Sequence, residues 1–426
     1  MRGLLTFTLI AFAALTPLAA LADDVAIEQR PADGDFAKAL IRDVGPIVRS
    51  FGSYNQSGCG SDVTGRQAMG YGAQGQVSAN SRPVLVVQNG SDTVGQPFVK
   101  FDGSLRSAVE EADRLGGAVI KFSARTLEQS PITLKAPLFI PSNTMIDGEC
   151  QNITLQAPPE VMLIAIRNVR DVTIRGLSLR KTSYDPESKS ARDVITVAGK
   201  FSGIWIDGNR FSRCGDGCID IVRFEHGRIT ISHNLFSDHN KTMLFYNAPC
   251  TPSSKVVACS QRSFNDDRPA EPKAFVTLFN NVFWGTAQRN PKIGADVYVH
   301  AVNNLILYRR YPYSNGRRGT AYGIAAMEGA QLFATDNVVV DLNERPRGSV
   351  GIGGSEADPD ESEPGRWGYI RQERNVVPGA ERLQSRKAEL VPLPTYTKLA
   401  AAIEISKYDW VNAAGCIARR LMVANC

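Results

Sequence analysis

The stretch ITISHNLF, Ile229–Phe236, carries the pattern that decides the fold. Its apolar residues alternate as in a short strand with one side facing inward. Asn234 follows where the chain must turn, and asparagine suits such a position because it tolerates the left-handed conformation and bonds nearby backbone groups. The pattern reads apolar, any, apolar, any, any, Asn, any, apolar.

The same pattern recurs along the middle of the chain. Four more copies place an asparagine at the same position, and an earlier copy, VTIRGLSL, has a leucine there; the key residues are Leu177, Asn209, Asn234, Asn281, Asn304 and Asn337. Their spacing describes a coil of roughly two dozen residues with loop insertions, and stacked coils would let successive amides bond to one another. We therefore predict an all-β protein, a single-stranded parallel β-helix. A β-sandwich of short strands is the alternative, but it gives no reason for an asparagine at one strand phase.

The flanking segments are less regular. Residues 1–22 have a basic start, an apolar run and small residues before the end, which predicts a secretory signal peptide and export of residues 23–426 as a single domain. GSLRSAVEEADRLGGAVIKF, residues 103–122, predicts a short amphipathic helix and a strand, and the helix could cap the N-terminal end of the coils. Residues 356–426 are expected to pack on the outside of the coils.

Charge and cysteines narrow the possible partners. The formal net charge is +5 with a pI near 8.7, which suits an acidic polymer, whereas dispersed basic residues argue against nucleic acid. No later segment is apolar for long enough to cross a membrane, and we expect a soluble monomer. Eight cysteines suit an oxidising compartment. Short separations favour the pairs Cys250–Cys259 and Cys416–Cys426, and no paired CxxC spacing suggests zinc.

Three acids form a candidate metal site. Asp216 and Asp220 lie four residues apart where a loop enters a strand, so both could face the same side. Asp193 starts a strand one coil earlier at nearly the same phase. Oxygen ligands without cysteine or histidine favour Ca²⁺, although surface acids paired with arginines would look the same in sequence.

Two basic residues follow on later coils. Lys241 lies 21 residues after Asp220, and Arg289 lies eight residues past Asn281. Either alone is more often a solvated surface charge. Together with the acids they would form a groove suited to a polyanionic chain.

The chain resembles the pectate lyases of polysaccharide lyase family 1. The resemblance covers about half of the chain in collinear order, and its motifs are GSLRSAV, SNTMIDGECQNITL, IWIDGN, DGCIDI, ITISHNLFSDHNKTML, VTLFNNVFWGTAQRNP and VNN. It implies a right-handed parallel β-helix, in agreement with the repeat.

The resemblance also implies a reaction and roles for named residues. Asp193, Asp216 and Asp220 match the calcium-binding acids, Lys241 matches a substrate-contacting lysine, and Arg289 matches the arginine regarded as the catalytic base. The implied reaction is β-elimination on α-1,4-linked polygalacturonate, with Ca²⁺ acidifying the C5 proton. An arginine is normally protonated, so the role as base requires a perturbed site.

Three positions depart from the family pattern. Gly294 stands where a second arginine is common, and Lys292 could replace it as a point charge at the substrate carboxylate. Val222 replaces the lysine of DIK, and Gly208 replaces the histidine of WIDH. These changes bear on substrate preference more than on the type of reaction.

The predicted function is thus a secreted, calcium-dependent pectate lyase that is extracellular or periplasmic. A pectin lyase acting on methyl-esterified polymer would not need a calcium bridge, and the three aspartates argue against it. A glycoside hydrolase would need two flanking carboxylates, and only Asp266 and Asp267 offer an unexplained pair. A non-catalytic carbohydrate-binding β-helix would leave the stacked acids and bases unexplained.

Overall fold

The structure is a computed structural model. It describes residues 42–46, 69–74, 81–149, 151–248, 260, 269, 271–313, 319–343, 350–353, 368–377, 381–382 and 388–396. The predicted signal peptide and the cysteines of the two favoured pairs lie outside these residues, as do Asp266 and Asp267. Within the described residues, no helix combines the length and the apolar character needed to cross a membrane.

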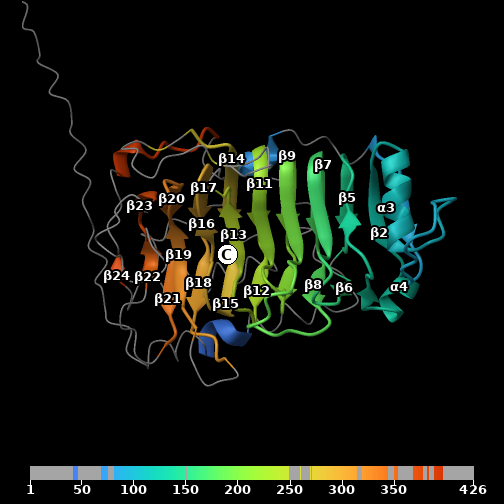
Figure 1. The fold of residues 1–426 in the computed structure, drawn as a ribbon, viewed down its shortest axis with the longest axis horizontal. Coiled ribbons are helices and arrows are strands. Elements are labelled where there is room, and N and C mark those ends of the chain that lie inside the picture. Colours follow the sequence, from blue (N-terminus) through green and yellow to red (C-terminus); the bar gives the residue numbers. More distant parts are fainter. Residues whose placement is uncertain are drawn as a thin grey trace, which may run out of the picture.

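Parallel strands wind into a β-helix, and each full coil gives one strand to each of three faces (Figure 1). Three long strands, β7 (Ile164–Arg175), β9 (Ile195–Asp207) and β11 (Ile219–Ser232), bend from the first face into the second. The first face continues with β4 (Leu138–Phe139), β13 (Met243–Tyr246), β16 (Lys292–Ile293), β19 (Tyr322–Ala326), β22 (Val350–Gly353) and β24 (Glu381–Arg382).

The other two faces complete the coils. The second face adds β1 (Val84–Val87), β2 (Ala118–Phe122), β5 (Thr144–Asp147), β14 (Ala274–Phe279), β17 (Val297–Val302), β20 (Gln331–Thr335) and β23 (Tyr369–Glu373). The third face has β3 (Ile132–Thr133), β6 (Thr154–Ala157), β8 (Ser178–Lys181), β10 (Arg210–Ser212), β12 (Leu235–Ser237), β15 (Val282–Thr286), β18 (Leu305–Tyr308) and β21 (Val338–Asp341). The inward side chains form one continuous apolar core. The predicted parallel β-helix is confirmed.

The repeated asparagines form a ladder inside the coils. The Oδ1 atom of each accepts the backbone N–H of its predecessor at 2.9–3.0 Å, and the series runs Asn209, Asn234, Asn281, Asn304, Asn337 and Asn375. Leu177 opens it by donating its backbone N–H to Asn209. The predicted ladder is confirmed. Its last member was missed because Gln372 stands at a template position that is apolar elsewhere.

The left-handed residue of each turn is not the ladder asparagine but the residue before it. These preceding residues have φ between 51° and 63°, and they are Gly208, His233, Asn280, Asn303, Asp336 and Arg374. The ladder asparagine can then keep an ordinary backbone and direct its amide along the stack. In each turn, one residue therefore adopts the left-handed conformation, and the asparagine after it forms the hydrogen bonds of the ladder.

A short helix covers the N-terminal end of the coils. Helix α3 (Leu105–Arg114) starts at Ser104, whose hydroxyl accepts the backbone N–H of Ser107, and its apolar side is buried. Figure 1 shows α3 beyond β2 at this end of the stack, with the five-residue helix α4 (Ala124–Glu128) nearby. Since a strand edge left open invites pairing with other chains, α3 protects the fold as predicted.

The segment after residue 355 departs in part from the prediction. Strand β23 and the following Asn375 continue the coil instead of packing outside it, because β23 pairs in register with β20 and Asn375 extends the ladder. Residues 388–396, with the 3₁₀-helix η4 (Ala388–Leu390), do pack on the second face. The hydroxyl of Tyr396 lies 3.0 Å from that of Thr277, beside the 3₁₀-helix η1 (Gly70–Ala73).

Candidate active site

Strand β11 places Asp220 on the outer side of the first face. Ile219 and Ile221 point into the core, so the intervening Asp220 points outward. Its in-register neighbours are Thr196 on β9 and Leu244 on β13. The Oδ1 atom accepts the backbone N–H of Leu244 at 3.1 Å, and only 5% of the residue is exposed. Asp220 is therefore a buried carboxylate fixed in orientation.

Asp193 meets Asp220 above Gly217. A Cβ added to Gly217 would lie 2.4 Å from Oδ1 of Asp220 and 3.3 Å from Oδ1 of Asp193. The two oxygens thus lie no farther apart than the sum of these distances. Thr196 holds the other oxygen of Asp193 by a 2.9 Å hydrogen bond from its hydroxyl. Any side chain at position 217 would fill the space that the two carboxylates share.

Asp216 lies on the same side but is bound differently. Its Oδ1 accepts a 2.7 Å hydrogen bond from the Nζ atom of Lys241, and both side chains are about one third exposed. The predicted proximity of Lys241 to the acids is confirmed. The carboxylate of Asp216 is therefore engaged by a cation rather than gathered with Asp193 and Asp220.

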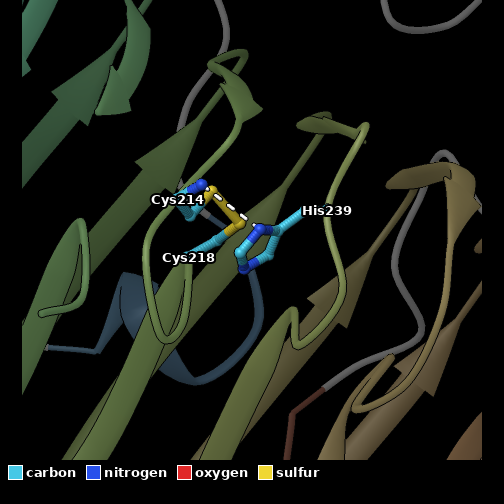
Figure 2. A group of neighbouring side chains, drawn as sticks. All are labelled: Cys214, Cys218 and His239. Carbon is cyan, nitrogen blue, oxygen red and sulfur yellow. Dashed lines mark hydrogen bonds between the residues drawn. A yellow bond between two sulfur atoms is a disulfide. The ribbon is translucent and has the colours of Figure 1, made fainter. Parts of the chain in front are cut away.

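A disulfide closes the loop that carries Asp216. It joins Cys214 to Cys218, and the backbone N–H of Cys214 donates to Nδ1 of the buried His239 (Figure 2). In the described part of the chain, these three residues are the one tight group of possible metal ligands, within 4.8 Å of one another. Since both sulfurs are used in the disulfide, the group is a structural clamp. The three aspartates are not grouped as tightly.

Burial and like charge act together on the acids. Burial raises the pKa of Asp220 well above its ordinary value, and the neighbouring Asp193 and Asp216 raise it further, against the opposing effect of Arg289. The pKa of Asp193 is also raised, first by burial and then by Asp216. Each shift means that the charged form costs free energy. A cation between these carboxylates would remove that cost.

The turn before β16 holds Arg289. Its φ is 60°, a left-handed value that is uncommon outside glycine. Hydrogen bonds fix the turn: the carbonyl of Arg289 accepts the N–H of Met243 at 2.8 Å, and the N–H of Asn290 donates to the carbonyl of Gly323 at 3.1 Å. The side-chain Oδ1 of Asn290 also accepts a 2.7 Å bond from the hydroxyl of Thr242. Two residues after Asn290, Lys292 lies in the same row of the sheet as Asp220, beyond Leu244. Arg289 and the acids thus border one face.

The position of the expected second arginine is occupied by an aromatic ring. A Cβ on Gly294 would lie 2.1 Å from Cδ2 of Tyr246, so the ring lies directly over this glycine. Burial and the nearby carboxyl group of Glu328 raise the pKa of the Tyr246 hydroxyl. Lys292 is the nearest cation in sequence, but it belongs to the row of Asp220. The surface around Gly294 is therefore aromatic and acidic instead of cationic.

Sequence reasoning missed several residues that support the site. Lys181 is fully buried, and its Nζ donates to the backbone carbonyls of Val161 and Asp193, the latter at 3.0 Å. Burial lowers its pKa to about 8. Tyr184 packs on His239 and accepts the N–H of Asn240 at 2.8 Å. A lysine at the end of a short strand is normally expected to be exposed, so nothing in the sequence indicated the buried position of Lys181 or the contacts of Tyr184.

The fold and this face define a class of protein: a parallel β-helix that presents carboxylates and cations from adjoining coils on one sheet. No family model matches the chain. It is 30% identical over 280 residues to Probable pectate lyase 4 of Arabidopsis thaliana, covering 64% of this chain and 66% of that one. It is 26% identical over 322 residues to Probable pectate lyase 18 of Solanum lycopersicum, covering 70% and 71%.

A solved structure agrees with the fold. The cedar pollen allergen Jun a 1 superposes with a TM-score of 0.53 at 20% identity, covering 85% of this chain and 98% of the allergen. The chain belongs to the pectate lyase family, and its fold is the right-handed parallel β-helix. The matches with the first four curated relatives span between 51% and 66% of their length.

Proposed function

We propose that this protein is a calcium-dependent pectate lyase that cleaves α-1,4-polygalacturonate by β-elimination. The observation that carries the proposal is the meeting of Asp193 and Asp220 over Gly217, on the face that Arg289 borders. Buried acids that raise one another's pKa are stabilised in their charged form when a cation binds between them. A neighbouring arginine and lysines attract a polyanion. The names of the curated relatives support the same reaction.

The donor set fits Ca²⁺. Asp193 and Asp220 offer carboxylate oxygens, and Asp216 could join them if its side chain left Lys241. Hard oxygen donors with no available nitrogen or sulfur are the ligands that Ca²⁺ prefers. Bound there, Ca²⁺ would neutralise the acids, hold the uronate carboxylate and withdraw charge from the C5–H bond.

The remaining steps are assigned to residues of the chain. Lys241 and Lys292 bind and orient the substrate carboxylates as point charges. Arg289, acting as base, takes the C5 proton; the C–H electron pair becomes the C4–C5 double bond as the C4–O bond breaks. The departing oxygen takes a proton from water, and Arg289 releases the C5 proton to solvent to restore its neutral form. The products are an unsaturated uronate and a new chain end. The fixed backbone around Arg289 supplies the positioning on which general base catalysis depends.

The test is an assay of the full chain on polygalacturonate with and without a chelator. We expect ultraviolet absorbance from the unsaturated product, its loss on chelation and its return with added Ca²⁺. Arg289→Ala should abolish this absorbance while the melting temperature stays the same. Reducing ends without absorbance would show hydrolysis instead. Activity that survives chelation would remove Ca²⁺ from the proposal.

One observation favours a second candidate, a lyase acting on methyl-esterified pectin. Tyr246 over Gly294, with the acid Glu328 beside it, would accept an uncharged methyl ester more readily than a carboxylate. The two candidates differ in one measurement, the relative rate on polygalacturonate and on highly methyl-esterified pectin. A higher rate on the ester that is unaffected by chelation would favour the second.

The setting of the reaction is part of the proposal. A cleaved signal peptide at residues 1–22 and an extracellular or periplasmic location would bring the enzyme to the polymer. The Cys214–Cys218 disulfide supports an oxidising compartment. We propose that the mature chain acts as a monomer without nucleic acid or membrane partners.

A further inference from the structure

Phe139 is an exposed aromatic residue on the first face. Its side chain stands on β4 and the residue is 65% exposed, whereas its neighbours Leu138 and Ile140 are buried. Among the large hydrophobic side chains that are exposed in the described residues, Phe139 is the only aromatic one. Leaving a phenyl ring in water forgoes the free energy that its burial would provide. Single exposed apolar residues are common, so the position of Phe139 decides its meaning.

That position is in line with the candidate active site. Phe139 pairs with Ala165 on β7, Ala165 pairs with Thr196 on β9, and Thr196 pairs with Asp220. Adjacent strands are about 4.8 Å apart, so three steps place Phe139 about 14 Å from Asp220 along the axis of the coils. A short run of linked sugar units spans such a distance. Phe139 therefore lies where a polymer would pass if it crossed the strands of this face.

The row between Asp220 and Phe139 carries only short side chains, those of Thr196 and Ala165. Ala165, between Phe139 and Thr196, has a side chain too short to obstruct a ligand. In the other direction the row carries the longer side chains of Leu244 and Lys292 before it reaches Ala325 and Gly353. A long substrate bound at Asp220 would thus extend over Ala165 toward Phe139.

A cation accompanies the ring. Arg167 lies two residues after Ala165 on β7, so it points to the same side, and it is exposed. No acid pairs with it in the part of the chain that the structure describes. A phenyl ring and a guanidinium on the same side of neighbouring strands offer stacking for the apolar side of a sugar ring and two parallel bonds for a carboxylate.

We propose that Phe139 and Arg167 form a distal subsite that binds one uronate unit of an acidic polysaccharide. The subsite rests on the proposed function only because both involve the same polymer, an acidic polysaccharide. It takes no part in bond cleavage. It would add affinity for long chains and none for fragments too short to reach it. Phe139→Ala should weaken binding of polygalacturonate roughly three- to ten-fold, the range for loss of one stacked aromatic contact.

The test is retention of the full chain in native gels cast with polygalacturonate. Phe139→Ala should migrate faster than wild type, and Phe139→Tyr should be retained like wild type. The control is Leu393→Ala, since Leu393 is exposed and lies in the segment 388–396 that packs on the second face. Arg167→Gln should lose retention on polygalacturonate but not on methyl-esterified pectin. Equal retention of Phe139→Ala and wild type would overturn the proposal, and so would equal loss with the control.

A second measurement separates the subsite from the proposed reaction. In the lyase assay, Phe139→Ala should raise KM on long polymer at unchanged kcat, with no change on trigalacturonate. Reduced retention without any unsaturated product would support the subsite and refute the lyase. Normal product formation with unchanged KM and retention would refute the subsite alone.

Discussion

Two carboxylates that converge on one glycine define the chemistry of this face at the scale of single residues. Asp220 is fixed by its strand and Asp193 by the hydroxyl of Thr196, and both reach toward Gly217. The missing side chain is what allows the approach. In the proposed calcium site the two acids would supply ligands, and Gly217 leaves the space in which an ion could bind them both.

A methyl group at this glycine should therefore reduce Ca²⁺ affinity. In Gly217→Ala the new Cβ would lie 2.4 Å from Oδ1 of Asp220, so the carboxylate must turn away. We expect affinity to fall roughly 10- to 100-fold, the range for displaced support of a metal ligand. Isothermal titration of the full chain with CaCl₂ measures it, and the melting temperature without Ca²⁺ serves as the control for folding. An affinity equal to wild type would exclude Gly217 from the site.

The site could be predicted from sequence only where residue type and strand phase coincide. Asp220 alternates with two isoleucines, so its outward direction was readable. The clamp by Cys214 and Cys218 and the ion pair between Asp216 and Lys241 depend on the path of a loop, which no periodicity encodes. Tyr246 over Gly294 likewise requires knowing the register of two coils.

At the scale of elements, the asparagine ladder is the structure that holds the coils in register. Each amide accepts a backbone N–H from one coil and also donates to a carbonyl, as Asn281 does to Ile231 at 2.9 Å. Buried polar groups that lose such partners cost about 1–3 kcal/mol each. Three phenylalanines, Phe211, Phe236 and Phe283, stack beside it with ring centroids 4.8 and 4.9 Å apart. The ladder thus combines satisfied amides with packed rings.

Removing one ladder amide should destabilise the whole stack. Asn281→Ala strips the acceptor from the N–H of Asn234 and leaves Asn304 short of a donor, so we expect a loss of about 3 kcal/mol or more. The adjacent Asn280 gives a matched control. It is buried and left-handed, but its amide has no partner within the described residues, so Asn280→Gly should be close to neutral. Urea unfolding compares the two, and similar losses would contradict the ladder's role.

At the scale of the whole molecule, stability depends on how the ends of the stack are closed. Ala108 and Ala112 of α3 are fully buried against the first coil, and they separate its strands from solvent. A solenoid without such a cap exposes an edge that pairs with other chains. The cap therefore determines solubility as well as stability.

A charged side chain on the buried side of α3 should destabilise the packing of this helix against the first coil. Ala112→Asp buries an unpaired carboxylate, which costs several kcal/mol, so we expect a lower melting temperature and soluble aggregates. Size-exclusion chromatography and thermal unfolding measure both effects. Asp113→Ala, on the exposed side of the same helix, should behave like wild type. A monomeric Ala112→Asp protein with wild-type melting would show that α3 is dispensable.

Most of the architecture was predictable because the repeat is local and periodic. The copies of the pattern located a strand in each of five coils, and the helix before the first coil followed from its amphipathic sequence. The coil that ends at Asn375 was missed, because Gln372 stands at a position of the pattern that is apolar in the other copies. Periodicity reveals a coil only where the apolar positions of the pattern are occupied by apolar residues.

The ladder also joins successive coils in the same way whatever the number of residues between them. The bond from Asn234 to Asn281 spans 47 residues and the bond from Asn281 to Asn304 spans 23, yet both measure 3.0 Å. Asn247 and Lys273 flank the interval between β13 and β14, and the backbone N–H groups of both donate to the neighbouring coil, at Ala295 and Asp296. These two anchors make the interval a natural acceptor for transplanted peptides. A foreign peptide could be inserted between these two anchors without redesigning the coils.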